Sequence, residues 1–234
     1  MLDIQHSCSL KVARGDKWTL VLASTSPRRY QILALLGLPF LMVPPAYQEV
    51  GARRAVPLPA EEALYLARQK AGSLVSLFPD AVILGSDTLI NLDGHLIGKP
   101  SSSGDARAIL KRLRGRSHDV VTAVCLLSGR GTARRAPTVF EWVETAHVTM
   151  RDFTDTELDA YLATGDSLDK AGAYSIQGAG RELVATFDGD YLAVVGLPLK
   201  AVAEGLAKLG CPVVVDVDRL YRGRNFLNWR TFGP

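Results

Sequence analysis

The chain contains little cysteine and no long apolar run, and each absence excludes a class of protein. Its three cysteines, Cys8, Cys125 and Cys211, are widely separated and form none of the close pairs of a structural zinc site. This usage argues against a disulfide framework and for a reducing compartment. No apolar stretch approaches the ~20 residues of a membrane-spanning helix, and residues 1–17 lack the apolar core of a secretory signal. We therefore expect a cytoplasmic protein with no membrane partner.

The signatures of several common enzyme classes are missing as well. The sequence has no G-x-x-x-x-G-K-[ST] phosphate loop, no dinucleotide fingerprint after a strand and no G-x-S-x-G serine elbow. Its four histidines show no ligand spacing, so we predict that each is structural or on the surface. Any phosphate chemistry must therefore be carried by another arrangement of residues.

The composition is that of an ordinary globular protein. The 234 residues are 47% hydrophobic and 22% charged, and they suit one domain or two small lobes that share a core. A formal net charge of +3 fits an enzyme of anionic small molecules better than a dedicated nucleic-acid binder. We predict a loose leader (1–17), one catalytic domain (18–212) and a basic, aromatic tail (213–234). Such a tail can grip single-stranded nucleic acid, but more often it docks on its own domain or on a partner subunit.

The stretch from Trp18 to Leu36 carries the strongest local signal. The apolar run Leu20–Ala23 predicts a buried strand, a serine-rich turn follows, and Pro27 opens a helix. Arg28 and Arg29 then lie in the first helical turn, at the positive end of the helix dipole. This placement is unfavourable unless an anion sits there, which indicates a phosphate site. The alternative is a capped helix whose two arginines point into water.

The rest of the chain alternates predicted strands and helices, which indicates an α/β protein. We expect strands at 40–43, 81–84, 119–127 and 139–150, helices at 60–78, 103–113, 154–164 and 198–209, and hairpins at 89–98 and 183–195 that turn at Asp93-Gly94 and Asp188-Gly189. The predicted helix at 154–164 begins with a capping box from Thr154 to Glu157.

A carboxylate follows the predicted strand 81–84. Asp87 lies in Gly85–Thr88, which we expect to be a loop at the carboxyl end of an inner strand, where α/β proteins place ligands. The hairpin after it would return Lys99 to the neighbourhood of Asp87. The alternative for Asp87 is a turn-capping role, and the alternative for Lys70 is an ordinary position beside the apolar face of its helix.

Together these residues suggest a chemistry. Four basic residues and two acids lie at loops, strand ends and helix flanks: Arg28, Arg29, Lys70, Lys99, Glu49 and Asp87. A polyphosphate needs several positive groups, because its charge is spread over many oxygens. Carboxylates beside it are useful if they hold a divalent cation or accept a proton from water. The set therefore predicts metal-assisted hydrolysis of a phosphoanhydride.

Six motifs, in the same order along the chain, resemble the Maf family. They are LASTSPRR at 22–29, GSDT at 85–88, GKP at 98–100, DKAGAYSIQG at 169–178, GDY at 189–191 and VVGLPL at 194–199. The resemblance implies an elongated α/β fold with a twisted mixed β-sheet flanked by helices and two lobes enclosing a cleft. It also implies a cytoplasmic nucleoside triphosphate pyrophosphatase, commonly a homodimer, that uses Mg²⁺ or Mn²⁺ and cleaves between the α and β phosphates.

The same resemblance implies a role for each site residue. Asp87 would accept the proton and bind the metal with Glu49, and the triphosphate would be held by Ser24, Arg29, Lys70 and Lys99. Base selection would fall to Arg28, Thr88 and Gln177, supported by Asp169 and Lys170. The chain resembles the subgroup that acts on dTTP and UTP, and on modified pyrimidine nucleotides, in three places: Arg-Arg at 28–29, Asp-Thr at 87–88 and Ile-Gln-Gly at 176–178. Two alternatives stay open: the same chemistry on a purine or 7-methylated nucleotide, or a nucleic-acid-binding regulator of cell division.

Overall fold

The computed structural model describes residues 19–47, 58–128, 138–226 and 228–231. Within them a seven-stranded sheet has the order β2-β1-β3-β5-β6-β7, with the short β4 paired to β3. The strands are β1 (Thr19–Ala23), β2 (Phe40–Val43), β3 (Ala81–Leu92), β4 (His95–Ile97), β5 (Ser117–Ser128), β6 (Thr138–Met150) and β7 (Val184–Asp188). The strand β1 runs parallel to β2 and β3, and the other pairs are antiparallel. The predicted mixed α/β sheet is confirmed.

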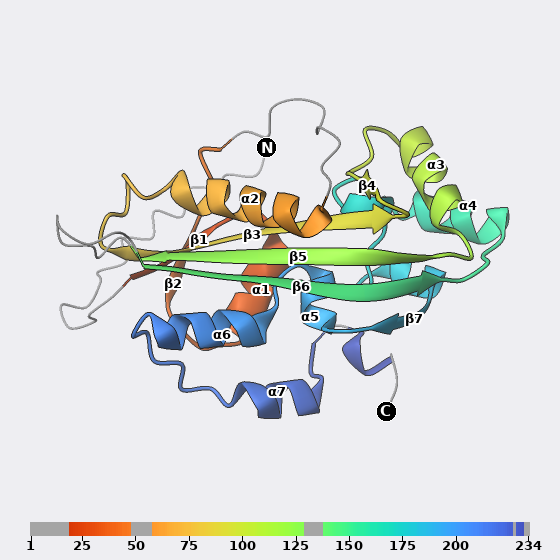
Figure 1. The fold of residues 1–234 in the computed structure, drawn as a ribbon. Helices are drawn as coiled ribbons and strands as arrows, with labels where there is room; N and C mark the ends of the chain where they lie inside the picture. Colours follow the sequence, from red (N-terminus) through yellow and green to blue (C-terminus); the bar gives the residue numbers. More distant parts are fainter. Residues whose placement is uncertain (1–18, 48–57, 129–137, 227, 232–234) are drawn as a thin grey trace, which may run out of the picture.

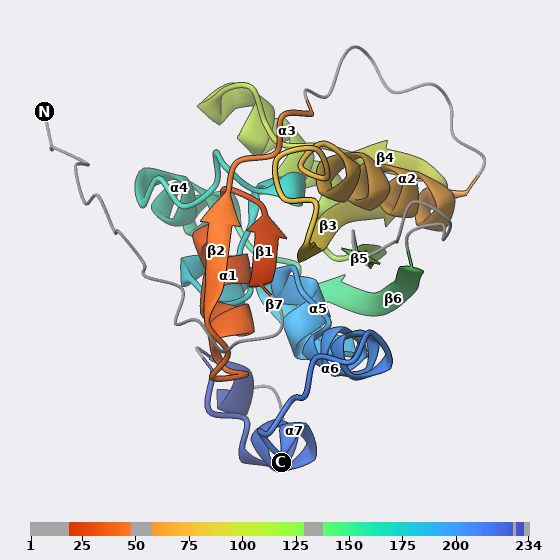
Figure 2. The same cartoon turned by 90° about the vertical axis from the view of Figure 1, so that its left-hand side faces the viewer.

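Helices cover both faces of this sheet. The α-helices are α1 (Pro27–Ala34), α2 (Pro59–Gly72), α3 (Ser103–Leu113), α4 (Asp155–Ala163), α5 (Tyr191–Val195), α6 (Leu199–Lys208) and α7 (Val217–Gly223), and the short 3-10 helices are η1 (Ala171–Ala173), η2 (Ala179–Leu183) and η3 (Trp229–Thr231). Helix α2 lies on one face and α5 and α6 lie on the other, with α7 outside α6 (Figures 1 and 2). None of the described helices is long and apolar enough to cross a membrane.

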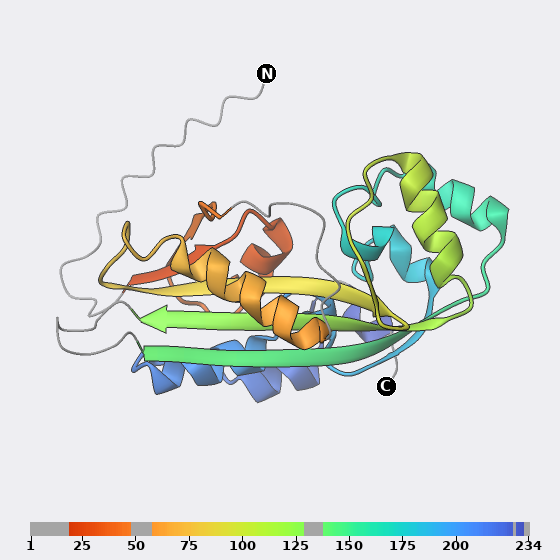
Figure 3. The ribbon, with the colours of Figure 1, turned by 45° about the horizontal axis from the view of Figure 1, so that its top comes forward.

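The core has three clusters, and β3 runs through all of them. On the first half of β3, Val82 and Leu84 face α1, α5 and α6, whereas Ile83 faces α2. Near its other end, Ile90 and Leu92 pack with α3 and α4 in a separate cluster. Figure 3 shows α3 and α4 set apart at one end of the molecule. The 12-residue length of β3 therefore lets one strand join two lobes.

The structure corrects the prediction that the strand beginning at Ala81 ends before Gly85. The strand β3 continues for 12 residues, and Gly85, Asp87 and Thr88 pair with β5 across an unbroken register. Gly85 serves close packing rather than a turn: a Cβ there would lie 2.2 Å from the backbone oxygen of Ala67 in α2. The absence of a side chain lets the helix approach the strand.

A second prediction was wrong at Tyr191–Val195, which forms the short helix α5 instead of a strand. Asp190 caps this helix by accepting a hydrogen bond from the backbone N–H of Leu192 at 2.8 Å. The turn at Asp188-Gly189 therefore leads into a helix cap. Helix α2 also ends at Gly72 rather than near residue 78.

Several local predictions are confirmed. The hairpin between β3 and β4 turns at Asp93 and Gly94, both with positive φ, as an Asp-Gly turn requires. The capping box at the start of α4 is present in both directions between Thr154 and Glu157. Each feature depends on contacts within a few residues, which is why sequence patterns predict it well.

Candidate active site

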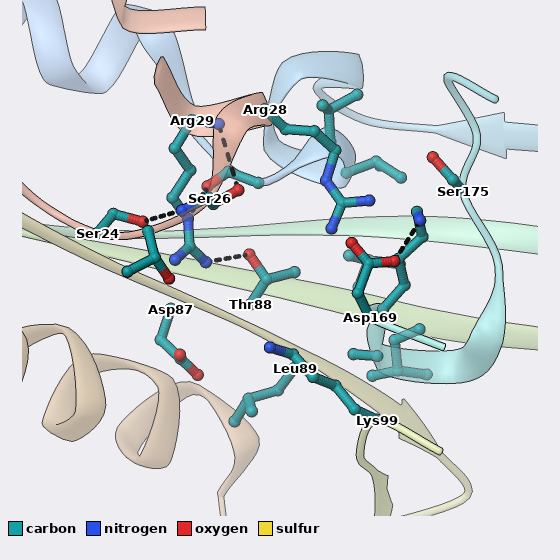
Figure 4. Close-up of a pocket in the computed structure, with 18 of the residues that line it drawn as sticks. Ser24, Ser26, Arg28, Arg29, Asp87, Thr88, Leu89, Lys99, Asp169 and Ser175 are labelled. Atoms are coloured by element: carbon teal, nitrogen blue, oxygen red, sulfur yellow. Dashed lines mark hydrogen bonds and ion pairs between the residues drawn. The ribbon is translucent and has the colours of Figure 1, made fainter. Parts of the chain in front are cut away.

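A cavity of about 750 Å³ lies among the elements that carry most of the predicted site residues. Its walls come from the β1–α1 turn, the middle of β3, the segment after β4, residues 169–176 and the end of α5. Figure 4 shows Ser24, Arg29, Asp87 and Thr88 on one side and Arg28, Asp169 and Ser175 on the other. Segments far apart in the sequence thus meet around one space.

The β1–α1 turn forms as its sequence predicts. Ser26 caps α1 by accepting a hydrogen bond from the backbone N–H of Arg29 at 3.4 Å, and Pro27 opens the helix. The buried Ser24 hydroxyl accepts from the N–H of Ser26 at 3.1 Å. These caps fix the start of the helix and direct Arg28 and Arg29 toward the cavity (Figure 4).

Arg29 is held in place by two contacts from its guanidinium. Its Nε donates to the carbonyl oxygen of Gly196 at 2.9 Å, and its Nη2 donates to the hydroxyl of Thr88 at 3.3 Å. The buried Ser86 hydroxyl donates to the same Gly196 carbonyl at 3.2 Å. The alternative in which both arginines simply point into water is therefore wrong for Arg29.

Thr88 belongs to a polarised chain of hydrogen bonds that ends at Thr122. The Thr122 hydroxyl oxygen lies 3.0 Å from that of Thr88 and 2.8 Å from the carbonyl oxygen of Ala193. The Thr122 hydroxyl is placed to donate to both oxygens, so Thr88 accepts from Arg29 and from Thr122 and keeps its own proton. Sequence reasoning missed the fully buried Thr122. Its only signal was a lone hydroxyl in an apolar strand.

Lys70 and Asp87 form a largely buried ion pair beside the cavity. Lys70 Nζ contacts Asp87 Oδ1, and the two side chains are only 14% and 7% exposed. Lys70 comes from the last turn of α2, and Asp87 projects from the middle of β3. The prediction that Asp87 lies on a loop was wrong, as was the alternative of a turn-capping aspartate. Its carboxylate nevertheless lines the cavity together with Lys99, as the hairpin predicts.

The second Asp87 oxygen, Oδ2, is buried and has no hydrogen-bond partner among the described residues. Those residues contain no group of three histidine, cysteine, aspartate or glutamate side chains that could hold a metal ion. A magnesium ion needs no such cage, because it is often bound by one or two carboxylates, waters and substrate phosphates. The orphaned oxygen fits such a site. The second predicted ligand, Glu49, lies outside the described residues.

The opposite wall carries a compact charge cluster. Lys170 Nζ contacts Asp169 Oδ1 and lies 2.8 Å from Asp166 Oδ1. Burial alone would raise the pKa of Asp169, but its hydrogen bond to Lys170 and the charges of Lys170 and Arg28 hold that pKa below its ordinary value. Asp169 is therefore an anion that orients the two cations around it.

Gln177 is the one described candidate that does not line the cavity, whereas Ser175 and Ile176 just before it do. Its side-chain oxygen is buried without a hydrogen-bond partner among the described residues. Its backbone oxygen accepts from Asn228, a residue that sequence reasoning did not single out.

Similarity to known proteins identifies the family of the chain. A family model described as Maf, Maf-like protein, matches residues 19–209. The chain belongs to the Maf family. It is 47% identical over 194 residues to a dTTP/UTP pyrophosphatase of Moorella thermoacetica, covering 83% of this chain and 96% of that protein. A dTTP/UTP pyrophosphatase of Dictyoglomus thermophilum is 39% identical over 196 residues, which cover 83% and 97% of the two chains.

A further relative of this Maf-family chain, the dTTP/UTP pyrophosphatase of Bacillus velezensis, is 40% identical over 187 residues, covering 80% of this chain and 94% of that one. Among solved structures, a nucleoside-triphosphatase, also titled dITP/XTP pyrophosphatase, from Mycobacterium abscessus matches at 17% identity with a TM-score of 0.38. That match covers 82% of this chain and 97% of that chain.

Proposed function

We propose that this Maf-family chain hydrolyses dTTP and UTP to the nucleoside monophosphate and pyrophosphate. One observation of the structure carries the proposal: a buried carboxylate oxygen of Asp87 that has no hydrogen-bond partner in the described part of the chain, on a cavity that Arg29, Lys70 and Lys99 also line. Cations match the distributed charge of a triphosphate, and a buried acceptor matches the proton of an attacking water. The choice of thymine and uracil as the bases follows the relatives, which are named dTTP/UTP pyrophosphatases.

In this proposal the water oxygen attacks the α-phosphorus, its proton passes to Asp87 Oδ2, and the bond from the α-phosphorus to the bridging oxygen breaks. The electron pair of that bond leaves with pyrophosphate. Ser24, Arg29, Lys70 and Lys99 hold the phosphate oxygens and offset the negative charge that develops on the departing group. The fixed Arg29 guanidinium needs little rearrangement to do so, because Thr88 and Gly196 already orient it.

A divalent cation, Mg²⁺ or Mn²⁺, would be held by Asp87 and Glu49. When bound it would neutralise phosphate charge and lower the barrier to attack by water. The homodimer, the cytoplasmic location and the 18–212 domain boundaries stay predictions of the sequence and its resemblance.

The base would lie toward Arg28, Thr88 and Gln177, with Asp169 and Lys170 behind Arg28. The hydrogen-bond chain supports a thymine or uracil ring. Because Thr88 accepts hydrogen bonds from Arg29 and from Thr122, the group that it can offer to a ligand is its own hydroxyl proton. Thymine and uracil present a carbonyl oxygen at the place where cytosine presents an amino group, so we expect dCTP to be a poor substrate.

The test is pyrophosphate release from a panel of triphosphates, with Mg²⁺, Mn²⁺ or a chelator. We expect metal-dependent release from dTTP and UTP that falls by at least about 100-fold in Asp87→Asn. The matched control is Asp93→Asn, the same change on the exposed turn of the same hairpin. A preference for a purine or a 7-methylated nucleotide would refute the proposed pyrimidine substrates. Full activity of Asp87→Asn would refute the proposed mechanism.

The nucleic-acid alternative finds no support in the described residues of the tail. Trp229 is only 6% exposed and stacks on Tyr191, and the Tyr221 hydroxyl donates to Asp190 at 2.8 Å. Packed rings such as these cannot serve as stacking platforms for bases.

A further inference from the structure

One wall of the cavity depends on a loop with few bonds of its own. Tyr174, Ser175 and Ile176 line the cavity, and Gln177 follows them directly. Within the loop the N–H of Gly178 donates to the carbonyl of Ser175 at 3.1 Å. The 3-10 helix η2 follows immediately, so no strand pairing holds residues 174–178 in place. A loop of this kind needs support from outside to present a fixed surface.

Part of that support comes from the buried Tyr174 hydroxyl, which lies 2.8 Å from His118 Nε2. The rest comes from the C-terminal segment, defined here as residues 216–226 and 228–231. The Nδ2 of Asn228 donates to the backbone oxygen of Gln177 at 3.0 Å and to that of Gly178 at 3.4 Å. Both partners are carbonyls, so the amide must turn its NH₂ toward the loop. On the far side of the loop, Arg181 donates to the hydroxyl and the carbonyl of Thr231 at 3.0 and 3.2 Å.

The segment is itself anchored in the core. The Trp229 ring stacks on Tyr191 of α5, with centroids 5.3 Å apart and planes 10° from parallel, and Tyr221 meets its edge at 5.1 Å. The match to the family model ends at residue 209, so this whole segment lies outside it. The C-terminal segment contacts both α5 and the loop. Two residues of α5, Val194 and Val195, also line the cavity.

We propose that the C-terminal segment is a positioning element for base recognition, with Asn228 fixing the loop that presents Ser175 and Ile176 to the cavity. This inference rests on the proposed function, because it concerns the same cavity. The Asn228 amide donates to the loop backbone, and Asn228 is not among the residues that line the cavity, so it would act on the loop position without contacting substrate. Its loss should change which base is preferred and leave the phosphate chemistry intact.

The decisive variant is Asn228→Asp, which keeps size and shape but turns a carboxylate oxygen toward two carbonyl oxygens. Asn228 has φ +58°, a left-handed conformation that asparagine, aspartate and glycine tolerate, so Asn228→Gly removes the amide with little added strain. The matched control is Asn225→Asp, the same change in the same segment, at a side chain that contacts Arg230 and not the loop.

Two readouts are compared at a temperature where every variant is folded. We expect amide exchange across residues 174–181 to rise about fivefold to tenfold in both Asn228 variants, the worth of one or two lost hydrogen bonds. We expect the ratio of kcat/KM for dTTP to that for dCTP to fall about fivefold, through KM for dTTP, with kcat nearly unchanged. A general loss of stability would not split KM from kcat in this way.

The inference is overturned if Asn228→Asp keeps both the exchange rates and the base ratio within twofold of wild type. It is equally overturned if Asn225→Asp shifts both readouts as much, since the segment would then act through stability alone. If wild type releases no pyrophosphate from any triphosphate, the proposed function fails, whereas the exchange comparison still decides whether Asn228 holds the loop.

Discussion

The ion pair between Lys70 and Asp87 has two roles that a double-mutant cycle can separate. The two side chains are only 14% and 7% exposed, so removing one charge takes this partner from the other where water is scarce. Breaking a buried pair costs about 3–5 kcal/mol. Asparagine can still accept a hydrogen bond from lysine, so we place Asp87→Asn at the low end, a loss of about 3 kcal/mol in the free energy of unfolding. Lys70→Met should cost about as much.

The double variant removes both charges together, so it should be more stable than the sum of the two single losses implies, with a coupling of about 2–3 kcal/mol. Activity should behave differently. Asp87→Asn should lose at least about 100-fold in kcat through loss of the proton acceptor, and the double variant should recover none of it.

The assays are urea unfolding followed by circular dichroism and pyrophosphate release from dTTP. A cycle with no coupling would show that the pair contributes nothing to the fold. A double variant that regains activity would refute Asp87 as the proton acceptor, because it would trace the loss to the charge of Lys70.

Three further predictions concern the scaffold of the site. Thr122→Val should lower the free energy of unfolding by about 2 kcal/mol, because a buried carbonyl of α5 loses its donor, and Thr122→Ser should restore most of it in the same urea titration. Gly85→Ala should cost about 3 kcal/mol, since the new Cβ would lie 2.2 Å from a backbone oxygen of α2; a thermal melt close to that of wild type would contradict the close packing. Burial lowers the pKa of His118 to about 4 from 6.5, outweighing the nearby Asp119. The unfolded chain therefore binds the proton more readily, so stability is full above pH 6.5 and should fall by about 2 kcal/mol at pH 5. His118→Gln should reduce the change in the free energy of unfolding between pH 7 and pH 5. An unchanged pH dependence would show that other groups cause it.

The sequence by itself determined the features that depend on neighbours in the chain. The strand, serine turn and Pro27 that begin α1, the Asp93-Gly94 hairpin and the Thr154 capping box follow from φ preferences and caps within four residues of each other. One cavity is lined by nine of the predicted site residues: Ser24, Arg28, Arg29, Lys70, Asp87, Thr88, Lys99, Asp169 and Lys170.

Only the tertiary structure decided how these units meet. A glycine in an apolar run is ambiguous between a turn and a close approach, and packing of α2 against Gly85 kept β3 intact through Asp87. The apolar run Tyr191–Val195 suits a strand or a short helix, and the Asp190 cap together with burial against the core selected the helix.

The partners of the site side chains were also beyond the reach of the sequence. Lys70 is 17 residues from Asp87, Thr122 is 34 from Thr88, and Asn228 is 51 from Gln177. Such contacts are set by strand register and by the path of the chain across the core, and no local propensity encodes either. The sequence identified the charges that could meet a triphosphate, and the fold determined which hydroxyls, carbonyls and tail residues hold them in place.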